Sequence, residues 1–193
     1  MANVEMLMDN ELDLVTGWLL CASSQVSSDY FQLPVAGKEE PEYRERVYSY
    51  ELYHRWRCHW PHDFRFSLSG EVDKLGNPLF RNQPKPDFLV HIPGQMTNLL
   101  IVEVKRQNAD VDKMVKDLEK LTVFRRDYNY HAAYFWIYGL AASEWPQLRD
   151  KIKAKVLGED KVDLSLITCF IHERAGIEAT PVDWFGSSAQ PNA

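Results

Sequence analysis

Two carboxylates and a lysine lie close together in the middle of the chain, within residues 85–105. Asp87 follows Pro86 and precedes the apolar segment 88–92, and Glu103 and Lys105 end a second apolar segment. Both segments are predicted to be strands, and the alternation of side chains puts Glu103 and Lys105 on one face. Charged groups near the end of an apolar strand are costly to bury unless they are paired, exposed or bound to a metal. This segment is therefore the first candidate for chemistry.

The chemistry follows from the functional groups. If the two strands are neighbours in a sheet, Asp87 and Glu103 can share one ion, and carboxylate oxygens favour Mg²⁺ or Mn²⁺. Such an ion polarises a phosphoryl oxygen and acidifies a bound water, while Lys105 holds that water or balances charge in the transition state. Glu51, on a predicted helix, could be a further ligand, directly or through water. These four residues predict a site that hydrolyses phosphodiesters.

The hydrophobic periodicity predicts the elements that would position this site. We expect helices over residues 4–23, 41–60, 111–128 and 144–157, and a loop over 23–38. We expect a hairpin or meander over 64–92 and strands over 99–104, 131–138 and 162–172. This order predicts an α/β fold, with a mixed β-sheet flanked by helices. Residues 1–185 are predicted to form a single domain, and 186–193 a disordered tail.

The helix predicted over residues 41–60 carries Glu51. Pro41 suits its first turn, neighbouring acids favour its positive end, and Pro61 ends it. Glu51 lies on a helix row beside Val47, so it is not expected on the solvated side. The alternative is a simple surface pair, since Glu51 and Arg55 are four residues apart.

Charge and cysteine content limit the possible functions. The 193 residues carry a net charge of -6, so any nucleic-acid surface must be local. Cys21, Cys58 and Cys169 are widely separated, which predicts neither a disulfide framework nor a zinc site and favours the cytoplasm. The apolar segment 14–22 is too short to span a bilayer, so no membrane association is expected.

Basic residues could form that local surface. Arg55, Arg57, Arg65, the row Lys113, Lys116 and Lys120, and the pair Arg125 and Arg126 could line a cleft that binds phosphates. The alternative is an ordinary solvated face, and the three lysines are expected off the buried stripe of their helix. A zinc site formed by His54, His59 and His62 near Cys58 is a weaker hypothesis.

The motif positions resemble a known family. A glutamate on an early helix (Glu51), Pro86-Asp87 on a strand, and Glu103-Val104-Lys105 on the next strand are similar to the PD-(D/E)XK, or restriction-endonuclease-like, nuclease superfamily. The resemblance covers roughly residues 41–140. It implies a restriction-endonuclease-like fold, here with an extra N-terminal helix. It also implies metal binding by Asp87, Glu103 and the Val104 carbonyl, water positioning by Lys105 and support from Glu51.

The function implied by this resemblance is a divalent-metal-dependent nuclease acting on DNA rather than RNA. One alternative is a catalytically silent subunit of the same fold that binds a protein partner or a second copy of itself. The net charge and the lack of a sequence-reading module favour that alternative. A third hypothesis is an unrelated α/β interaction domain, in which Asp87 is a turn residue and Lys105 faces another surface.

Overall fold

A six-stranded mixed sheet forms the centre of the computed structural model, which describes residues 2–70, 86–158 and 160–186. Its strands follow one another in sequence order: β1 (Ser67–Gly70), β2 (Phe88–His91), β3 (Asn98–Arg106), β4 (Tyr130–Tyr138), β5 (Thr168–His172) and β6 (Thr180–Val182). Strands β3, β4 and β5 are parallel to one another, and the other pairings are antiparallel. The predicted α/β class with a mixed sheet is confirmed.

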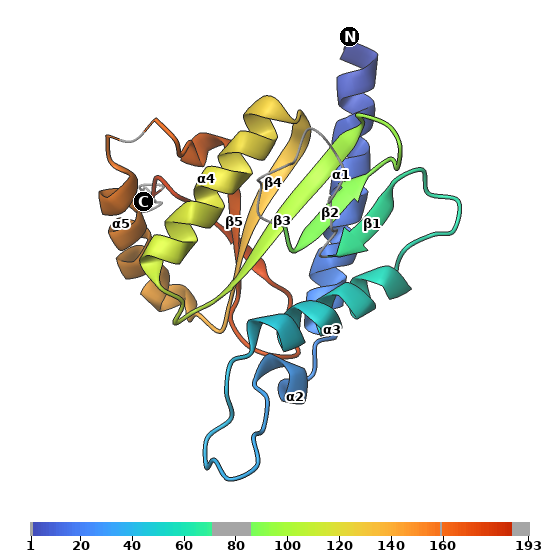
Figure 1. Ribbon diagram of the computed structural model, residues 1–193. Coiled ribbons are helices and arrows are strands. Elements are labelled where there is room, and N and C mark those ends of the chain that lie inside the picture. Colours follow the sequence, from blue (N-terminus) through green and yellow to red (C-terminus); the bar gives the residue numbers. More distant parts are fainter. Residues whose placement is uncertain (1, 71–85, 159, 187–193) are drawn as a thin grey trace, which may run out of the picture.

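Helices cover both faces of this sheet. The helices are α1 (Ala2–Ser24), α2 (Ser28–Phe31), α3 (Glu45–Cys58), α4 (Val111–Asp127) and α5 (Trp145–Val156). In Figure 1, α4 lies in front of the sheet, and α1 runs behind it. The helices predicted over 4–23, 111–128 and 144–157 are confirmed, whereas the predicted loop 23–38 contains α2. Among the described helices, none combines the length and the apolar character needed to cross a membrane.

The second predicted helix starts later than expected. Residues 41–44 stay outside it because Glu42 forms an isolated β-bridge with Leu33, and Arg44 at the N-cap is extended. The first acid inside the helix is therefore Glu45, and the acids before residue 45 are not in its first turn as expected. This shift of four residues matters for the site, because it places Glu45 at the end of the helix nearest to β3.

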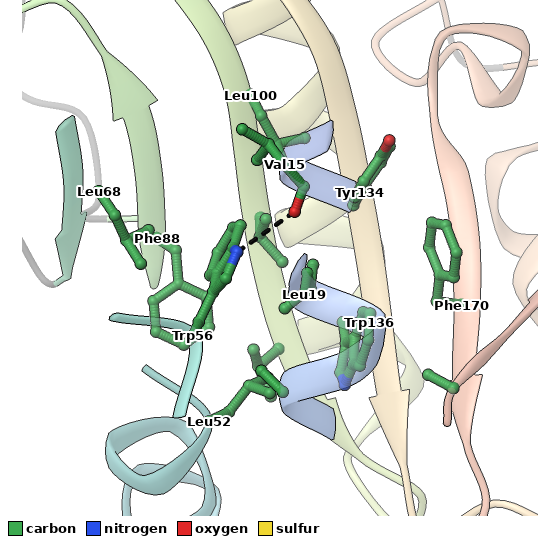
Figure 2. Packing of buried hydrophobic residues seen from close by; sticks show 14 of the residues in the cluster. Val15, Leu19, Leu52, Trp56, Leu68, Phe88, Leu100, Tyr134, Trp136 and Phe170 are labelled. Atoms are coloured by element: carbon green, nitrogen blue, oxygen red, sulfur yellow. Dashed lines mark hydrogen bonds between the residues drawn. The ribbon is translucent and has the colours of Figure 1, made fainter. Parts of the chain in front are cut away.

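Two apolar layers hold the sheet between the helices. On one face, α1 and α3 bury side chains against β3 and β4, and Figure 2 shows Leu19 and Trp56 packed there. The indole Nε1 of Trp56 donates a hydrogen bond to the Val15 carbonyl over 3.3 Å, which ties α3 to α1 (Figure 2). On the other face, α4 and α5 pack against the alternate residues of the same strands. Burial of both faces explains why β3 is almost continuously apolar.

Two predicted strands need qualification. The antiparallel pairing of β1 with β2 confirms the predicted hairpin within 64–92, but its connection at residues 71–85 lies outside the described residues. The strand predicted over 162–172 begins only at Thr168, because the 3₁₀ turn Leu164–Leu166 precedes it. The predicted disordered tail lies outside the described residues after Gly186.

Candidate functional site at the end of strands β2 and β3

The site lies where β2 begins and where β3, still paired with β4, extends beyond its pairing with β2. Phe88, the first residue of β2, pairs with Val102, so β2 offers no strand partner beside Val104. The peptide groups of Val104 are satisfied by side chains instead. Its N–H donates to Oδ2 of Asp87 over 2.7 Å, and its carbonyl accepts from Nζ of Lys105 over 3.1 Å. Asp87 and Lys105 are thus held at the two backbone polar groups of one residue, Val104, at the end of β3.

A chain of alternating charges runs from this strand end into α4 and α3. Glu103 Oε1 accepts from Lys120 Nζ over 2.7 Å, and Lys120 Nζ lies 3.0 Å from Asp117. Asp117 in turn lies 3.2 Å from Lys105 Nζ, which is 3.1 Å from Glu45. We call these five residues the charge chain. Its members come from β3, α4 and α3, so it forms only when the three elements are packed together.

Burial makes the carboxylates of this region hard to ionise. Burial raises the pKa of Asp87 to about 6, even though the Val104 N–H and the charge of Lys105 lower it. Burial also raises the pKa of Glu103 well above its usual range, and the charge of Asp87 adds to this effect. The exposed fraction of Glu103 is only 2%. A cation between the two carboxylates would relieve both effects.

The two lysines of the charge chain, Lys105 and Lys120, keep their charge despite their burial. Burial alone would lower the pKa of Lys105, but the charges of Asp117, Glu45 and Asp87 outweigh burial and raise it. The same balance, with Glu103 and Asp117 as partners, raises the pKa of Lys120. Both lysines therefore stay charged at neutral pH. Lys105 can donate hydrogen bonds and balance negative charge, but it cannot serve as a general base.

A cleft of about 610 Å³ opens beside the charge chain. It lies between the start of α3, the end of β3 and α4, and six cations and three carboxylates line it. The exposed Lys113 and Lys116 form no ion pair among the described residues, so their charge is available to a ligand. The cations are Arg44, Lys105, Arg106, Lys113, Lys116 and Lys120. This is the local basic surface that the acidic chain requires for binding phosphates.

The structure brings together four of the five predicted site residues. Asp87, Glu103, Val104 and Lys105 meet at the strand end, whereas buried Glu51 forms an ion pair with Arg55 over 2.6 Å. The residue of α3 that reaches Lys105 is Glu45. Each residue turns an α-helix by 100°, so Glu51 lies about 120° away from Glu45 around the axis. Glu51 therefore lies on a different side of α3 from Glu45 and does not point toward the end of β3.

Two members of the charge chain, Asp117 and the buried Lys120, were not predicted as site residues from the sequence. Lys120 was expected off the buried stripe of its helix, but only 7% of it is exposed. It is buried because it pairs with Glu103, a contact that the helical periodicity of α4 cannot reveal. A possible signal was Asp117 itself, since an acid three residues before a lysine can pair with it on one helix face.

Several of the predicted phosphate-binding arginines hold the fold together instead. Arg55 pairs with Glu51, and Arg65 binds Glu11 of α1. Arg125 donates to the carbonyls of Tyr130 and His131, and Arg126 pairs with Asp163 over 2.9 Å. The lysine row, by contrast, does line the cleft.

The residues present fit a hard divalent cation through few protein ligands. Oδ1 of Asp87 and Oε2 of Glu103 accept no hydrogen bond among the described residues, so each carboxylate has an oxygen to offer. Among all residues that the structure describes, no group of three His, Cys, Asp or Glu side chains is placed so that it could hold a metal ion. Two carboxylates with water and substrate phosphate are a usual ligand set for Mg²⁺.

The geometry also bears on the third hypothesis. Asp87 and Lys105 do not face different surfaces, because both bind backbone groups of Val104. Comparison with known proteins adds no information about the site: no family model, no curated protein and no solved structure matches the chain.

Proposed function

We propose that the protein is a divalent-metal-dependent nuclease that hydrolyses phosphodiester bonds, with DNA as the substrate. One observation carries the proposal: two carboxylates, the half-buried Asp87 and the buried Glu103, lie beside the permanently charged Lys105 at the edge of a basic cleft. The resemblance to the PD-(D/E)XK superfamily supports the same chemistry. The fold, with β3 between β2 and β4 and helices on both faces, is consistent with a restriction-endonuclease-like arrangement.

The chain's own residues would divide the work. Mg²⁺ or Mn²⁺ held by Asp87, Glu103 and the Val104 carbonyl would polarise the phosphoryl group and acidify a bound water. Lys105 would donate to that water or to a non-bridging phosphate oxygen, since its raised pKa keeps it protonated. Lys120 would hold Glu103 in place through their 2.7 Å contact. Glu45 and Asp117 would fix the position of the Lys105 ammonium group.

The basic cleft would hold the substrate backbone next to this centre. Lys113 and Lys116 lie on α4 along the cleft, so they can contact phosphates on one side of the scissile bond. Binding through such contacts is dependent on salt, because each phosphate contact releases counterions. The cleft therefore predicts affinity for polyanions without sequence selection.

Nicking of supercoiled plasmid in Mg²⁺ or Mn²⁺ tests the proposal directly. We expect wild-type protein to nick, and Lys105→Met to slow nicking by roughly 10²- to 10³-fold, as for removal of one transition-state donor. Asp150→Asn is the matched control for Asp87→Asn, because Asp150 is an exposed carboxylate on α5 whose single ion-pair partner among the described residues is Arg149. We expect Asp87→Asn to abolish nicking and Asp150→Asn to nick as wild type does. Equal nicking by wild type, Lys105→Met and Asp87→Asn would overturn the assignment of the site.

A second candidate is a catalytically silent subunit of similar fold that acts with a protein partner or a second copy. One observation favours it: Oε1 of Glu103 is already occupied by the Lys120 ammonium, so the site is neutralised internally. This candidate predicts no nicking with any divalent metal, together with a stable complex in size-exclusion chromatography with light scattering. Metal-dependent nicking that Asp87→Asn abolishes would exclude it.

A further inference from the structure

A second, smaller pocket adjoins Asp87 on the side of β1 and α3. It has a volume of about 290 Å³ and is lined by Ser49, Tyr50, Tyr53, Gly70, Asp87 and Phe88. The basic cleft has none of these residues in its lining, so the two cavities are distinct. Asp87 lies at the boundary, because it lines the small pocket and also binds the Val104 peptide of the site.

Aromatic rings supply much of the wall of this pocket. Tyr53 is fixed, since its ring stacks on Phe88 at 6.2 Å and its hydroxyl donates to the Leu68 carbonyl over 3.4 Å. Tyr50 is free to adapt, with 57% of its surface exposed. An exposed ring beside a fixed ring is suited to hold a flat aromatic group between them, because stacking needs a rigid platform and an opening.

Gly70 keeps the pocket open beside Tyr53. A Cβ atom at this position would lie 3.4 Å from Cδ2 and 3.5 Å from Cε2 of the Tyr53 ring. Any larger side chain would therefore have to occupy the space next to that ring. The backbone of Gly70 does not have a positive φ, so conformational freedom does not explain the glycine.

Ser49 supplies an unused polar group. Its exposed fraction is only 7%, and its hydroxyl has no hydrogen-bond partner among the described residues. A buried hydroxyl without a partner costs free energy that a ligand carrying a donor or acceptor would recover. Ser49 lies on α3 four residues from both Glu45 and Tyr53, so it belongs to the helix row that faces the site.

We propose that this pocket binds an unpaired nucleobase of the substrate, adjacent to the phosphodiester that reacts at Asp87. The inference rests on the proposed nuclease function and names its substrate class: a single strand, or a nucleotide turned out of a duplex. The base stacks against Tyr50 and Tyr53, and its polar edge binds the Ser49 hydroxyl. A base inside an intact duplex is stacked on its neighbours and cannot enter such a pocket without being extruded.

Binding of a short fluorescein-labelled single strand, followed by anisotropy in EDTA, tests the pocket without requiring hydrolysis. Stacking on one aromatic side chain contributes about 1–3 kcal/mol, so we expect Tyr50→Ala to weaken binding by roughly 5- to 150-fold. Tyr30→Ala is the matched control, because Tyr30 is 47% exposed on α2, outside the pocket lining. Gly70→Leu, which fills the space beside Tyr53, should weaken binding without removing an aromatic ring.

A single abasic position scanned along the same strand separates stacking from other effects. With the abasic site at the position that enters the pocket, wild type and Tyr50→Ala should bind equally well. The inference would be overturned if Tyr50→Ala lost the same binding affinity for every abasic strand, or lost no affinity at all. Tighter binding of an intact duplex than of the single strand, unaffected by Tyr50→Ala, would do so too.

These outcomes are distinguishable from failure of the proposed function. If strand binding depends on Tyr50 but the protein nicks no plasmid with any metal, the nucleobase pocket is supported and the proposed nuclease function is rejected. If Asp87→Asn abolishes nicking but Tyr50→Ala does not change strand binding, the proposed nuclease function is supported and the nucleobase pocket is rejected.

Discussion

On the α3 face of the sheet, the buried polar groups form a neutral network. Trp136 Nε1 donates to the Tyr48 hydroxyl over 2.7 Å, and this hydroxyl lies 2.7 Å from His172 Nδ1, to which it can donate its hydrogen. On the α4 face, the ionisable side chains of Glu103 and Lys120 are buried against each other, 2.7 Å apart. The neutral network lies within the core, whereas the charge chain reaches a basic cleft.

This difference indicates two different roles. Neutral hydrogen-bonded groups fix packing at small cost, because each polar atom only exchanges water for another partner. Buried ions are costly, and replacing them with apolar residues often stabilises a protein. A cluster of buried charges beside a cleft is therefore a candidate for function, and the network around Tyr48 is a candidate for structure alone.

The largest expected effect on stability comes from removing one partner of the buried Glu103–Lys120 pair and leaving the other in place. Lys120→Met should lower the free energy of unfolding by about 3–5 kcal/mol, because it leaves Glu103 buried without its partner. The double variant Glu103→Gln/Lys120→Met should recover most of that loss. Urea unfolding followed by circular dichroism measures both. Arg126→Met, which breaks the exposed pair with Asp163, is the control and should cost at most about 1 kcal/mol. A double variant as unstable as Lys120→Met would show that the loss of stability does not come from leaving Glu103 without its partner.

The neutral network predicts a loss of stability in acid. Burial lowers the pKa of His172 from 6.5 to about 4, so the unfolded chain takes up a proton before the folded one does. The stability contributed by neutral His172 is complete above pH 6.5 and is lost as the pH falls toward 4, by about 3 kcal/mol. Relative to wild type, His172→Phe should therefore gain stability as the pH falls through this window. A difference between the two proteins that does not change with pH would contradict the buried neutral histidine.

The site predicts the opposite slope in nearly the same window. Burial raises the pKa of Asp87 from 3.8 to about 6, so the folded protein holds this proton more tightly than the unfolded chain does. The resulting stability is complete below pH 3.8 and is lost as the pH rises to about 6, again by about 3 kcal/mol. Asp87→Asn should gain stability over wild type as the pH rises, measured by urea unfolding in EDTA. The same slope for Asp87→Asn and His172→Phe would remove the contrast between the two regions.

The smallest effect is expected for Tyr48→Phe. Loss of this hydroxyl leaves Trp136 Nε1 and His172 Nδ1 without their partner and should cost about 1–3 kcal/mol. Plasmid nicking per folded molecule should not change, because Tyr48 contacts neither the cleft nor the charge chain in the described structure. Thermal unfolding and nicking at a temperature where both proteins are folded make the comparison. A large loss of nicking would mean that the two regions are coupled.

The fold could be predicted further than the site. Alternation within residues 99–105 correctly placed Glu103 and Lys105 on one face and Val104 on the other, since that pattern is local. The start of α3 could not be predicted, because it depends on the bridge between Leu33 and Glu42. Glu45 and Glu51 both fall within the predicted helix, and only the packing of α3 brings Glu45 rather than Glu51 to Lys105. The burial of Lys120 was missed for a similar reason, as its partner Glu103 is brought near only by the packing of α4 on β3.

Calorimetric titration with Mg²⁺, and again with Mn²⁺, tests the central claim that Asp87 and Glu103 form a cation site. We expect wild-type protein and Tyr48→Phe to bind with the same affinity, and Asp87→Asn to bind at least roughly tenfold more weakly, which corresponds to about 1.4 kcal/mol. Heat from wild-type protein that equals dilution into buffer, or equal binding by wild type and Asp87→Asn, would contradict the claim.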